Sequence, residues 1–247
     1  MTQPQPSPVE FENPGAPGRV LIVCEHASND FPAPWGDLGL TAAQRAAHIA
    51  WDPGALGLAR GLARRLDAPL VRATLSRLIY DLNRPPHAPG AMAATSEADS
   101  IPGNRDLPAD ERLRRMAALY LPFHHGVRMM LASRLALGQV PVLVTVHSFT
   151  PVYLGRRRDV ELGVIHDADD RLARAIVAQD TGLLTRLNEP YSAADGVHHT
   201  LALHATPLGL HHAMLEIRND LIADSAAQET VAARLAPVIA QAIEEVA

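Results

Sequence analysis

The sequence of 247 residues contains no lysine, because all 22 of its basic residues are arginines. A Schiff-base mechanism and a phosphate-binding P-loop both need a lysine side chain, so both are excluded. The 27 acidic residues outnumber the basic ones and give a formal net charge of -5, and the longest basic run is only Arg156 to Arg158. This balance argues against nucleic acid or an acidic membrane surface as the main partner.

Cysteine is almost absent as well, and Cys24 is the only one. One thiol forms neither an internal disulfide nor a cysteine-based zinc site, and its place inside an apolar run is typical of an inert core residue. No apolar run reaches the ~20 residues of a membrane span, and the first 18 residues contain no signal-peptide core. We therefore expect a soluble cytoplasmic protein, for which 47% apolar residues provide an ample core.

One apolar run in the sequence ends in reactive side chains. Residues 20–24 form the continuous run expected of a strand covered on both faces, and Glu25 and His26 follow directly. In open α/β sheets, ligands bind in the crevice beyond the carboxyl ends of the strands. His26 therefore lies where a functional group is expected.

Two later segments repeat this design. Residues 140–145 are another β-rich apolar run, which leads into His147. Residues 213–218 alternate, so that Glu216 and Arg218 share one face of a strand. The pattern predicts three strands that deliver two histidines and a glutamate to the same edge of a sheet.

Helical patterns lie between the predicted strands, at about residues 41–50, 53–66, 108–135, 167–179 and 225–242. Thr41 is expected to cap the first of these helices, Asp167 to cap the fourth, and Pro122 to divide the third. Strands that alternate with helices predict a single three-layer α/β/α domain with a mainly parallel, mixed sheet.

The expected domain covers residues 19–247. Residues 1–18 contain five prolines and are expected to form a flexible extension. Residues 85–106 are rich in Pro, Ala, Gly and Ser, and a structureless loop of this length is often a lid or a binding loop.

Histidines at two strand ends, in a chain without cysteine pairs, are compatible with a catalytic zinc site. Such sites use three ligands from His, Asp and Glu and leave a fourth position for water. His26 and His147 are the first two candidate ligands, although a strand-end histidine is also commonly a hydrogen-bonded structural residue. Sequence spacing does not name the third ligand. Asp52 is the best candidate, although its Asp-Pro pair also suits a helix start, and Glu25 and Asp30 are alternatives.

Glu216 suits a general base, because the apolar residues on either side of it would desolvate the carboxylate and raise its pKa. A buried ion pair with an arginine is the alternative interpretation. Arg77, Arg84 and Arg218 are candidates for the bidentate fork that binds a carboxylate. Arg84 has the most distinctive context of the three, between Asn83 and two prolines.

The remaining histidines and serines carry weaker signals. His124 and His125 lie in the long predicted helix and are interpreted as packing residues. His211 and His212 precede Glu216 closely enough for one of them to reach the site. A serine-hydrolase site is disfavoured, because the chain has no G-x-S-x-G elbow.

Seven segments, taken in order, resemble the N-formylglutamate amidohydrolase family. They are CEHASNDFP, AWDPGA, SRLIYDLNRPP, IPGN, YLPFH, VHSFTP and LEIRNDL, and the resemblance runs from about Val9 to Asp220. It implies a fold similar to that of the zinc carboxypeptidases. It also implies a zinc-dependent amidohydrolase that removes the formyl group from an N-formyl acidic amino acid. N-formyl-L-glutamate is the leading substrate, with formate and L-glutamate as products.

The resemblance also implies roles for individual residues. His26 and His147 match the metal-binding histidines of the family, and Asp52 matches its acidic position after the first motif. Glu216 looks like the glutamate that serves as base in zinc carboxypeptidases, and Arg84 is the expected carboxylate clamp. Further candidates for substrate binding are Asn83, Arg218 and Ser148.

One position departs from the zinc carboxypeptidase pattern. Those enzymes carry a glutamate three residues after their first histidine, where this chain has Asn29. An amide is a poor zinc ligand, so the second ligand must come from elsewhere. Two alternatives to the leading function also remain: a hydrolase for another N-acyl amino acid or peptide, and a non-catalytic homologue that binds an amino-acid-like ligand.

Overall fold

The middle layer of the molecule is a mixed sheet of seven strands in the computed structural model, which describes residues 7–192, 194 and 196–246. In spatial order the strands are β1 (Val9–Glu12), β3 (Leu70–Ala73), β2 (Val20–Cys24), β6 (Val142–Phe149), β11 (His212–Arg218), β9 (Leu162–Ile165) and β10 (Thr185–Leu187). The four strands from β3 to β11 run parallel, and only β1 and β9 pair antiparallel with their inner neighbours. The predicted mainly parallel, mixed sheet is therefore confirmed.

Strand β2 shows why these apolar runs lie in the middle of the sheet. All five of its residues are buried, and they point alternately to the two sides of the sheet. Val20, Ile22 and Cys24 join one hydrophobic core, while Leu21 and Val23 join the other. A strand without a polar face is stable only when both of its faces are covered.

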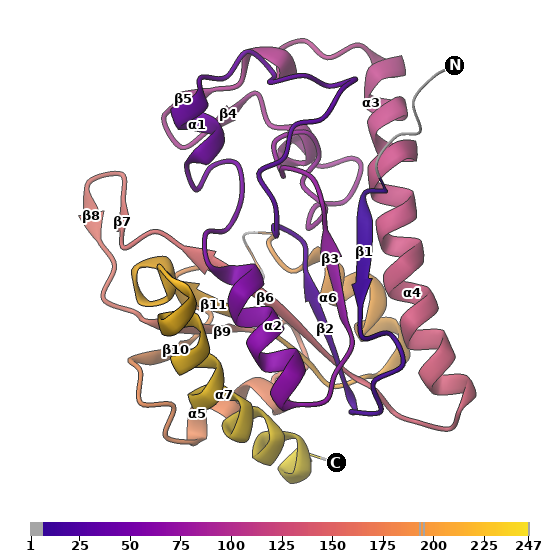
Figure 1. The fold of residues 1–247 in the computed structure, drawn as a ribbon, viewed down its shortest axis with the longest axis vertical. Helices are drawn as coiled ribbons and strands as arrows, with labels where there is room; N and C mark the ends of the chain where they lie inside the picture. Colours follow the sequence, from indigo (N-terminus) through magenta and orange to yellow (C-terminus); the bar gives the residue numbers. More distant parts are fainter. Residues whose placement is uncertain (1–6, 193, 195, 247) are drawn as a thin grey trace.

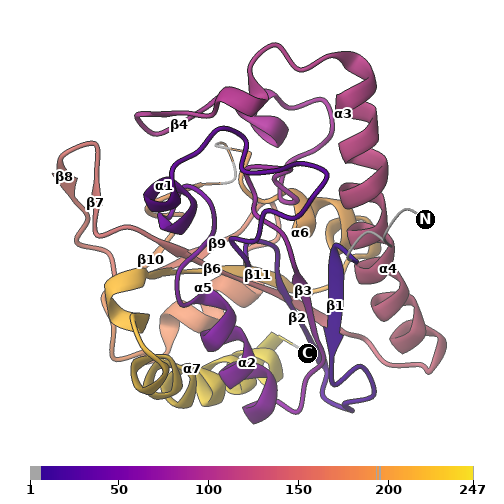
Figure 2. The ribbon, with the colours of Figure 1, turned by 45° about the horizontal axis from the view of Figure 1, so that its top comes forward.

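Helices supply that cover on each side (Figures 1 and 2). The apolar faces of α2 (Ala55–Arg65), α5 (Arg171–Ala178) and α7 (Ser225–Val246) pack into the first core. The second core contains residues of α4 (Leu121–Ala136) and α6 (His199–His204) and of the loops above them. The expected three layers, α/β/α, are thus present.

The N-terminal segment differs from the expected flexible extension. Residues 9–12 form β1, the edge strand that pairs antiparallel with β3, because Val9 and Phe11 alternate with glutamates and suit a strand covered on one side. Residues 1–6 of that extension lie outside the described residues.

Short elements occupy the long loop at residues 85–106. It contains 3₁₀ turns at Pro89–Met92 and Pro102–Asn104, and a small hairpin of β4 (Thr95–Ser96) and β5 (Asp99–Ser100). The buried Asn104 amide donates to the carbonyl oxygens of Leu78 and Ala93, so the loop is tied to the domain. A second small hairpin is formed by β7 (Val152–Tyr153) and β8 (Arg156–Arg157).

The long helix is divided near Pro122, as expected. Its first part, α3 (Ala109–Arg115), continues into a π-helical turn at Met116–Tyr120, and Pro122 lies in the first turn of α4. Proline lacks the N–H group of a regular helix interior, and the backbone N–H of Leu121 bonds to Met116 O instead of to the carbonyl four residues back.

Two of the expected helix boundaries need correction. Thr41 does cap α1 (Ala42–Ala46), but this helix ends early, because the Asn29 and Trp51 side chains donate to its last carbonyl groups. Asp167 does not cap α5, whose N-cap residue is Asp170. The Asp167 carboxylate instead accepts bonds from the Thr206 hydroxyl, the His212 ring and a backbone N–H.

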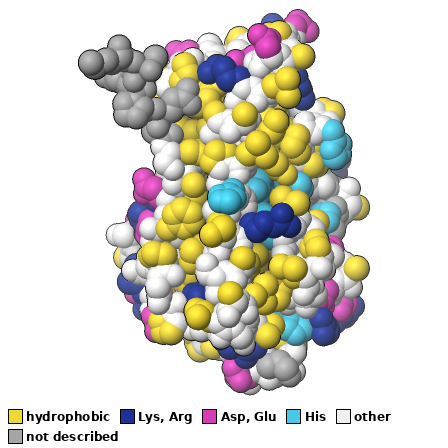
Figure 3. Space-filling model, turned by 90° about the vertical axis from the view of Figure 1, so that its right-hand side faces the viewer, with side chains coloured by type: hydrophobic (Ala, Val, Ile, Leu, Met, Phe, Trp, Pro, Cys, Tyr) yellow, Lys and Arg dark blue, Asp and Glu magenta, His cyan; other side chains and the backbone are white. Residues whose placement is uncertain are grey.

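The outer side of α3 and α4 exposes Leu113, Leu121 and Met129, and apolar side chains are scattered over this side of the molecule in Figure 3. Within the described residues, every helix is too short or too polar to cross a membrane.

Candidate metal centre and catalytic pocket

His26, Asp52 and His147 lie together at the carboxyl-terminal edge of the parallel strands. His26 follows β2, His147 lies near the end of the adjacent strand β6, and Asp52 precedes α2. Asp52 Oδ2 is 3.2 Å from His26 Nδ1 and 3.0 Å from His147 Nδ1, and the two Nδ1 atoms are 3.1 Å apart. All three side chains are buried. The structure thus brings the three candidate ligands into one group that could hold a metal ion.

The spacing of these atoms fits a small tetrahedral cation. Ligand atoms about 2.0 to 2.1 Å from such an ion are about 3.3 to 3.4 Å from one another. The three observed separations are 0.1 to 0.4 Å shorter than this range, so small side-chain shifts would accommodate an ion. The donor set, two imidazoles and a carboxylate, is one that catalytic zinc sites use.

A second carboxylate stands behind each imidazole. Asp81 Oδ1 lies 2.8 Å from His26 Nε2, and Glu25 Oε2 lies 3.1 Å from His147 Nε2. A carboxylate at Nε2 retains the proton there and leaves Nδ1 as the lone-pair atom. When a proton is held at Nε2 of each neutral ring, both Nδ1 atoms face Asp52 with lone pairs that could bind a cation.

The other two candidates for the third ligand lie elsewhere. Glu25 contacts the far nitrogen of His147, on the side of the ring away from Asp52. Asp30 is exposed and belongs to no group of candidate metal ligands among the described residues.

Arg77 balances the negative charge of this centre. Its guanidinium lies 3.3 Å from Asp52 Oδ1 and 2.6 Å from Asp81 Oδ2. Burial disfavours the charged form of both carboxyls, but His26 and Arg77 outweigh burial and hold the pKa of each well below its usual value. The two aspartates are therefore ionised at neutral pH.

Glu216 lies beside the three candidate ligands, on the next strand of the sheet. It is directly opposite His147 in the register of β11 and β6, and it is buried. One of its carboxylate oxygens has no hydrogen-bond partner among the described residues. Burial raises the pKa of Glu216 to about 7, against the opposing effect of His147. A carboxylate with that pKa can accept and return a proton near neutral pH.

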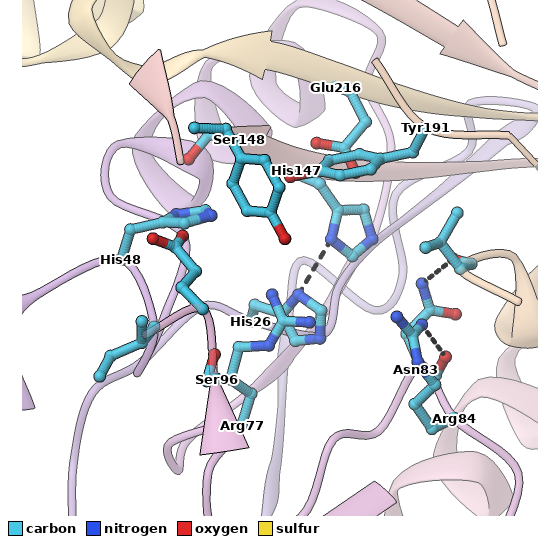
Figure 4. Close-up of a pocket in the computed structure, with 14 residues that line it drawn as sticks. His26, His48, Arg77, Asn83, Arg84, Ser96, His147, Ser148, Tyr191 and Glu216 are labelled. Atoms are coloured by element: carbon cyan, nitrogen blue, oxygen red, sulfur yellow. Dashed lines mark hydrogen bonds between the residues drawn. The ribbon is translucent and has the colours of Figure 1, made fainter. Parts of the chain in front are cut away.

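A pocket of about 170 Å³ opens onto this group. Figure 4 shows His26, His147 and Glu216 facing the same space, with Arg77 and Arg84 at its lower edge. Tyr153, Tyr191 and residues of the β4–β5 hairpin form other parts of its wall.

The candidate substrate-binding residues divide into two groups. Arg84, Asn83 and Ser148 line the pocket, whereas Arg218 does not. The Arg218 guanidinium donates to Asp220 and to two backbone carbonyls, and it lies 3.5 Å from Glu161.

The lining residues are themselves held in place. Arg84 Nη1 donates to the carbonyl oxygens of Asn83 and Gly196, and within the part of the chain that the structure describes its other N–H groups have no hydrogen-bond partner. The Asn83 amide accepts from the backbone N–H of Thr200 and donates to Val197 O. The backbone N–H of Ser148 donates to Asp52 Oδ2.

The other singled-out histidines lie outside the pocket. His124 packs between helices as expected: its Nδ1 is 2.9 Å from His204 Nε2, and its Nε2 is 2.9 Å from Leu82 O. His211 and His212 face Asp169 and Asp167, so neither reaches the site. His211 directly precedes β11 and His212 begins it, whereas the candidate ligands meet near the other end of this strand, beside Glu216.

Sequence reasoning missed several residues of the site. Asp81 lies in SRLIYDLNRPP, but nothing in its spacing indicates contact with His26, 55 positions earlier. Glu25 is a candidate ligand by sequence, whereas in the structure it lies behind His147, and no sequence motif points to Tyr153 or Tyr191. The rarity of aromatic residues, which make up 4% of the chain, was the one available signal for the two tyrosines.

Comparison with known proteins adds to this geometry. A family model described as N-formylglutamate amidohydrolase matches residues 18–223. A gene product of Agrobacterium tumefaciens, known from its crystal structure, is 50% identical, with a TM-score of 0.96 over 98% of this chain and 96% of that one. The crystal structure of N-formylglutamate amidohydrolase from Ralstonia eutropha JMP134 is 18% identical, with a TM-score of 0.69 over 97% of this chain and 98% of that one, which shows a shared fold. No curated protein matches the chain.

Proposed function

Because the chain belongs to the N-formylglutamate amidohydrolase family, we propose that it is a metal-dependent hydrolase of N-formyl acidic amino acids. N-formyl-L-glutamate is the leading substrate, and formate and L-glutamate are the products. The observation that carries this proposal is the convergence of His26, Asp52 and His147 beside a buried carboxylate, Glu216, in one pocket.

Nδ1 of His26, Nδ1 of His147 and a carboxylate oxygen of Asp52 would hold the ion, which we propose to be zinc. When bound, zinc polarises a carbonyl group and lowers the pKa of a water molecule toward about 7. Asp81 and Glu25 orient the two imidazoles from behind. His26 and Arg77 keep Asp52 and Asp81 ionised, so Asp52 stays available for a cation and Asp81 for the His26 ring.

Glu216 transfers a proton from the attacking water to the amine nitrogen. It accepts a proton from the water that attacks the formyl carbon, and it returns that proton to the amine nitrogen as the C–N bond breaks. One water is consumed, and the formyl group leaves as formate. A pKa near 7 suits a group that must first accept and then donate a proton.

Arg84 positions the substrate. Its guanidinium lines the pocket and, among the described residues, has N–H groups without a partner, which can form paired hydrogen bonds with a carboxylate. Asn83 holds the segment at residues 197–200 against the pocket, and Ser148 holds Asp52, so these two residues position other groups.

The test combines metal analysis with kinetics on Glu216→Gln. We expect about one zinc per chain in both the wild type and the variant, and a kcat on N-formyl-L-glutamate about 10²- to 10⁴-fold lower in the variant. Glu244→Gln, on the exposed surface of α7, is the control and should match the wild type in both measurements.

Other outcomes would change the assignment. Full activity in Glu216→Gln would remove this residue from the mechanism, and full activity in metal-free protein would refute the metal dependence. Turnover of only another N-acyl amino acid in a substrate panel would change the substrate. Protection from thermal unfolding by N-formyl-L-glutamate without any turnover would indicate a non-catalytic binding protein.

A further inference from the structure

A second pocket adjoins the catalytic pocket and opens outward from it. The two share part of their lining, including Arg84, Tyr153 and Tyr191. The outer pocket adds Arg156 and Arg158, which do not line the catalytic pocket. A ligand anchored at the catalytic centre can therefore extend into the outer pocket without leaving the protein surface.

Aromatic rings hold Arg158 in place there. Its guanidinium carbon lies 4.5 Å from the ring centroid of Tyr153, 4.9 Å from that of Tyr191 and 5.4 Å from that of Phe149. Phe149 is the last residue of β6 and follows His147 by two positions, so the same strand supports the metal centre and this arginine. Contact with these three rings restrains the position of the guanidinium.

Among its described residues, the outer pocket carries an unbalanced positive charge. Three guanidinium groups line it, those of Arg84, Arg156 and Arg158, and its described lining contains no carboxylate. None of the three forms an ion pair with a carboxylate of the described residues. Arg158 makes one long bond to the protein backbone, from Nη1 to Thr150 O at 3.4 Å. A site of this kind suits an anionic group from a ligand.

Tyr191 connects the outer pocket to the proposed base. Its ring contacts Arg158, and it lines the catalytic pocket together with Glu216. Burial and the negative charge of Glu216 raise the pKa of Tyr191 to about 12, while Arg158 acts in the opposite direction. Arg158 therefore lies one side chain away from the reacting centre.

We propose that Arg158 binds the side-chain carboxylate of the substrate, while Arg84 binds the α-carboxylate. The α-carboxylate is attached to the carbon that carries the scissile amide nitrogen, so it must stay within the catalytic pocket. The side-chain carboxylate lies several bonds further out, where the outer pocket begins. Arg158 then selects acidic amino acids over neutral ones. This inference rests on the proposed function.

The experiment compares Arg158→Gln with the wild type on N-formyl-L-glutamate and N-formyl-L-glutamine, which have nearly the same shape and differ in side-chain charge. We expect kcat/KM on the glutamate derivative to fall about 10- to 100-fold, the loss that follows removal of a charged hydrogen bond. The value on the glutamine derivative should stay within about 2-fold. Arg157→Gln, at an exposed position that lines neither pocket, is the control and should leave both values unchanged.

Equal losses on the two substrates, or no loss on either, would overturn the assignment. Calorimetric binding of L-glutamate and L-glutamine provides a second test that does not depend on turnover. Arg158→Gln should weaken binding of L-glutamate selectively, and equal effects on both ligands would overturn the assignment again. If the wild type hydrolyses neither formyl derivative, the proposed function fails, and the calorimetric comparison alone decides the role of Arg158.

Discussion

At the scale of single residues, the candidate metal centre depends on carboxylates that would not touch a metal. Nδ1 and Nε2 of an imidazole compete for one proton, and the partner of Nε2 decides which nitrogen presents a lone pair. Asp81 fills this position for His26, and Glu25 fills it for His147. Because both carboxylates are buried, neither can turn to water instead.

We therefore predict that Asp81→Asn lowers the affinity for zinc about 10- to 100-fold, because an amide holds the His26 ring less firmly. The measurement is competition with a chelator of known affinity. Asp30→Asn is the control, since this exposed carboxylate should leave the affinity unchanged. Wild-type affinity in Asp81→Asn would show that the carboxylate does not orient the ring.

At the scale of elements, α2 and α7 approach each other through small residues. Gly57 and Gly61 lie one turn apart on α2, opposite Gln228 and Ala232 of α7. A Cβ atom at Gly61 would lie 2.5 Å from the Cβ of Ala232, which no rotation can relieve. The proposed ligand Asp52 lies just before α2, so the position of this helix also determines where the carboxylate stands.

Gly61→Ala should therefore destabilise the protein. Overpacking costs about 1 to 3 kcal/mol, and the better helix propensity of alanine offsets about 1 kcal/mol of that. Gly57→Ala is the matched control, because its new methyl group meets the flexible Gln228 side chain, which can move away at the cost of its hydrogen bond to Ile222 O. Urea unfolding measures both variants, and equal stability of the two would contradict this account of the packing.

At the scale of the whole molecule, buried histidines link the helical layer to the acid stability of the fold. His124 of α4 donates from Nε2 to Leu82 O, so a neutral His124 ring accepts at Nδ1 a hydrogen bond from His204 of α6. Burial lowers the pKa of His124 to about 3 and that of His204 to about 4. Neighbouring positive charges lower both values further, those of histidines at His124 and that of Arg128 at His204. In an unfolded chain both would have a pKa near 6.5.

The sign of the pH effect follows from these values. Above pH 6.5 both histidines are neutral in the folded and unfolded states, so they contribute the same stability at any such pH. As the pH falls from 6.5 toward 4, only the unfolded chain takes up protons, so the free energy of unfolding decreases. At pH 5.5 we expect a loss of about 1 kcal/mol for each histidine relative to pH 7.5.

Urea unfolding at pH 7.5 and pH 5.5 tests this expectation. His204→Gln should lose about 1 kcal/mol less than the wild type between the two pH values, because one titrating group is gone. His125→Gln, at an exposed neighbouring position on α4, should keep the wild-type loss. The same loss in His204→Gln as in the wild type would show that His204 does not contribute to the acid sensitivity.

The sequence alone determined the architecture and the strand ends that carry the site. Apolar runs such as residues 20–24 can be stable only between two covering layers, and a charged or imidazole side chain that follows such a run must lie at the edge of the sheet. Residue patterns therefore predicted the mixed α/β/α fold. They also indicated His26, His147 and Glu216 as candidate site residues. It also predicted the division of the long helix at Pro122, because a proline ring affects its own helix whatever lies around it.

Only the tertiary structure decided which side chains meet. It set Asp52 against both histidines, Glu25 behind one of them, and Arg218 away from the pocket. It also brought Asp81 to His26 and enclosed Arg158 between rings from three separate segments. Local periodicity specifies the face on which a residue lies, whereas distances between segments far apart in the chain depend on strand order and on how the connecting loops pack, and no local pattern encodes these.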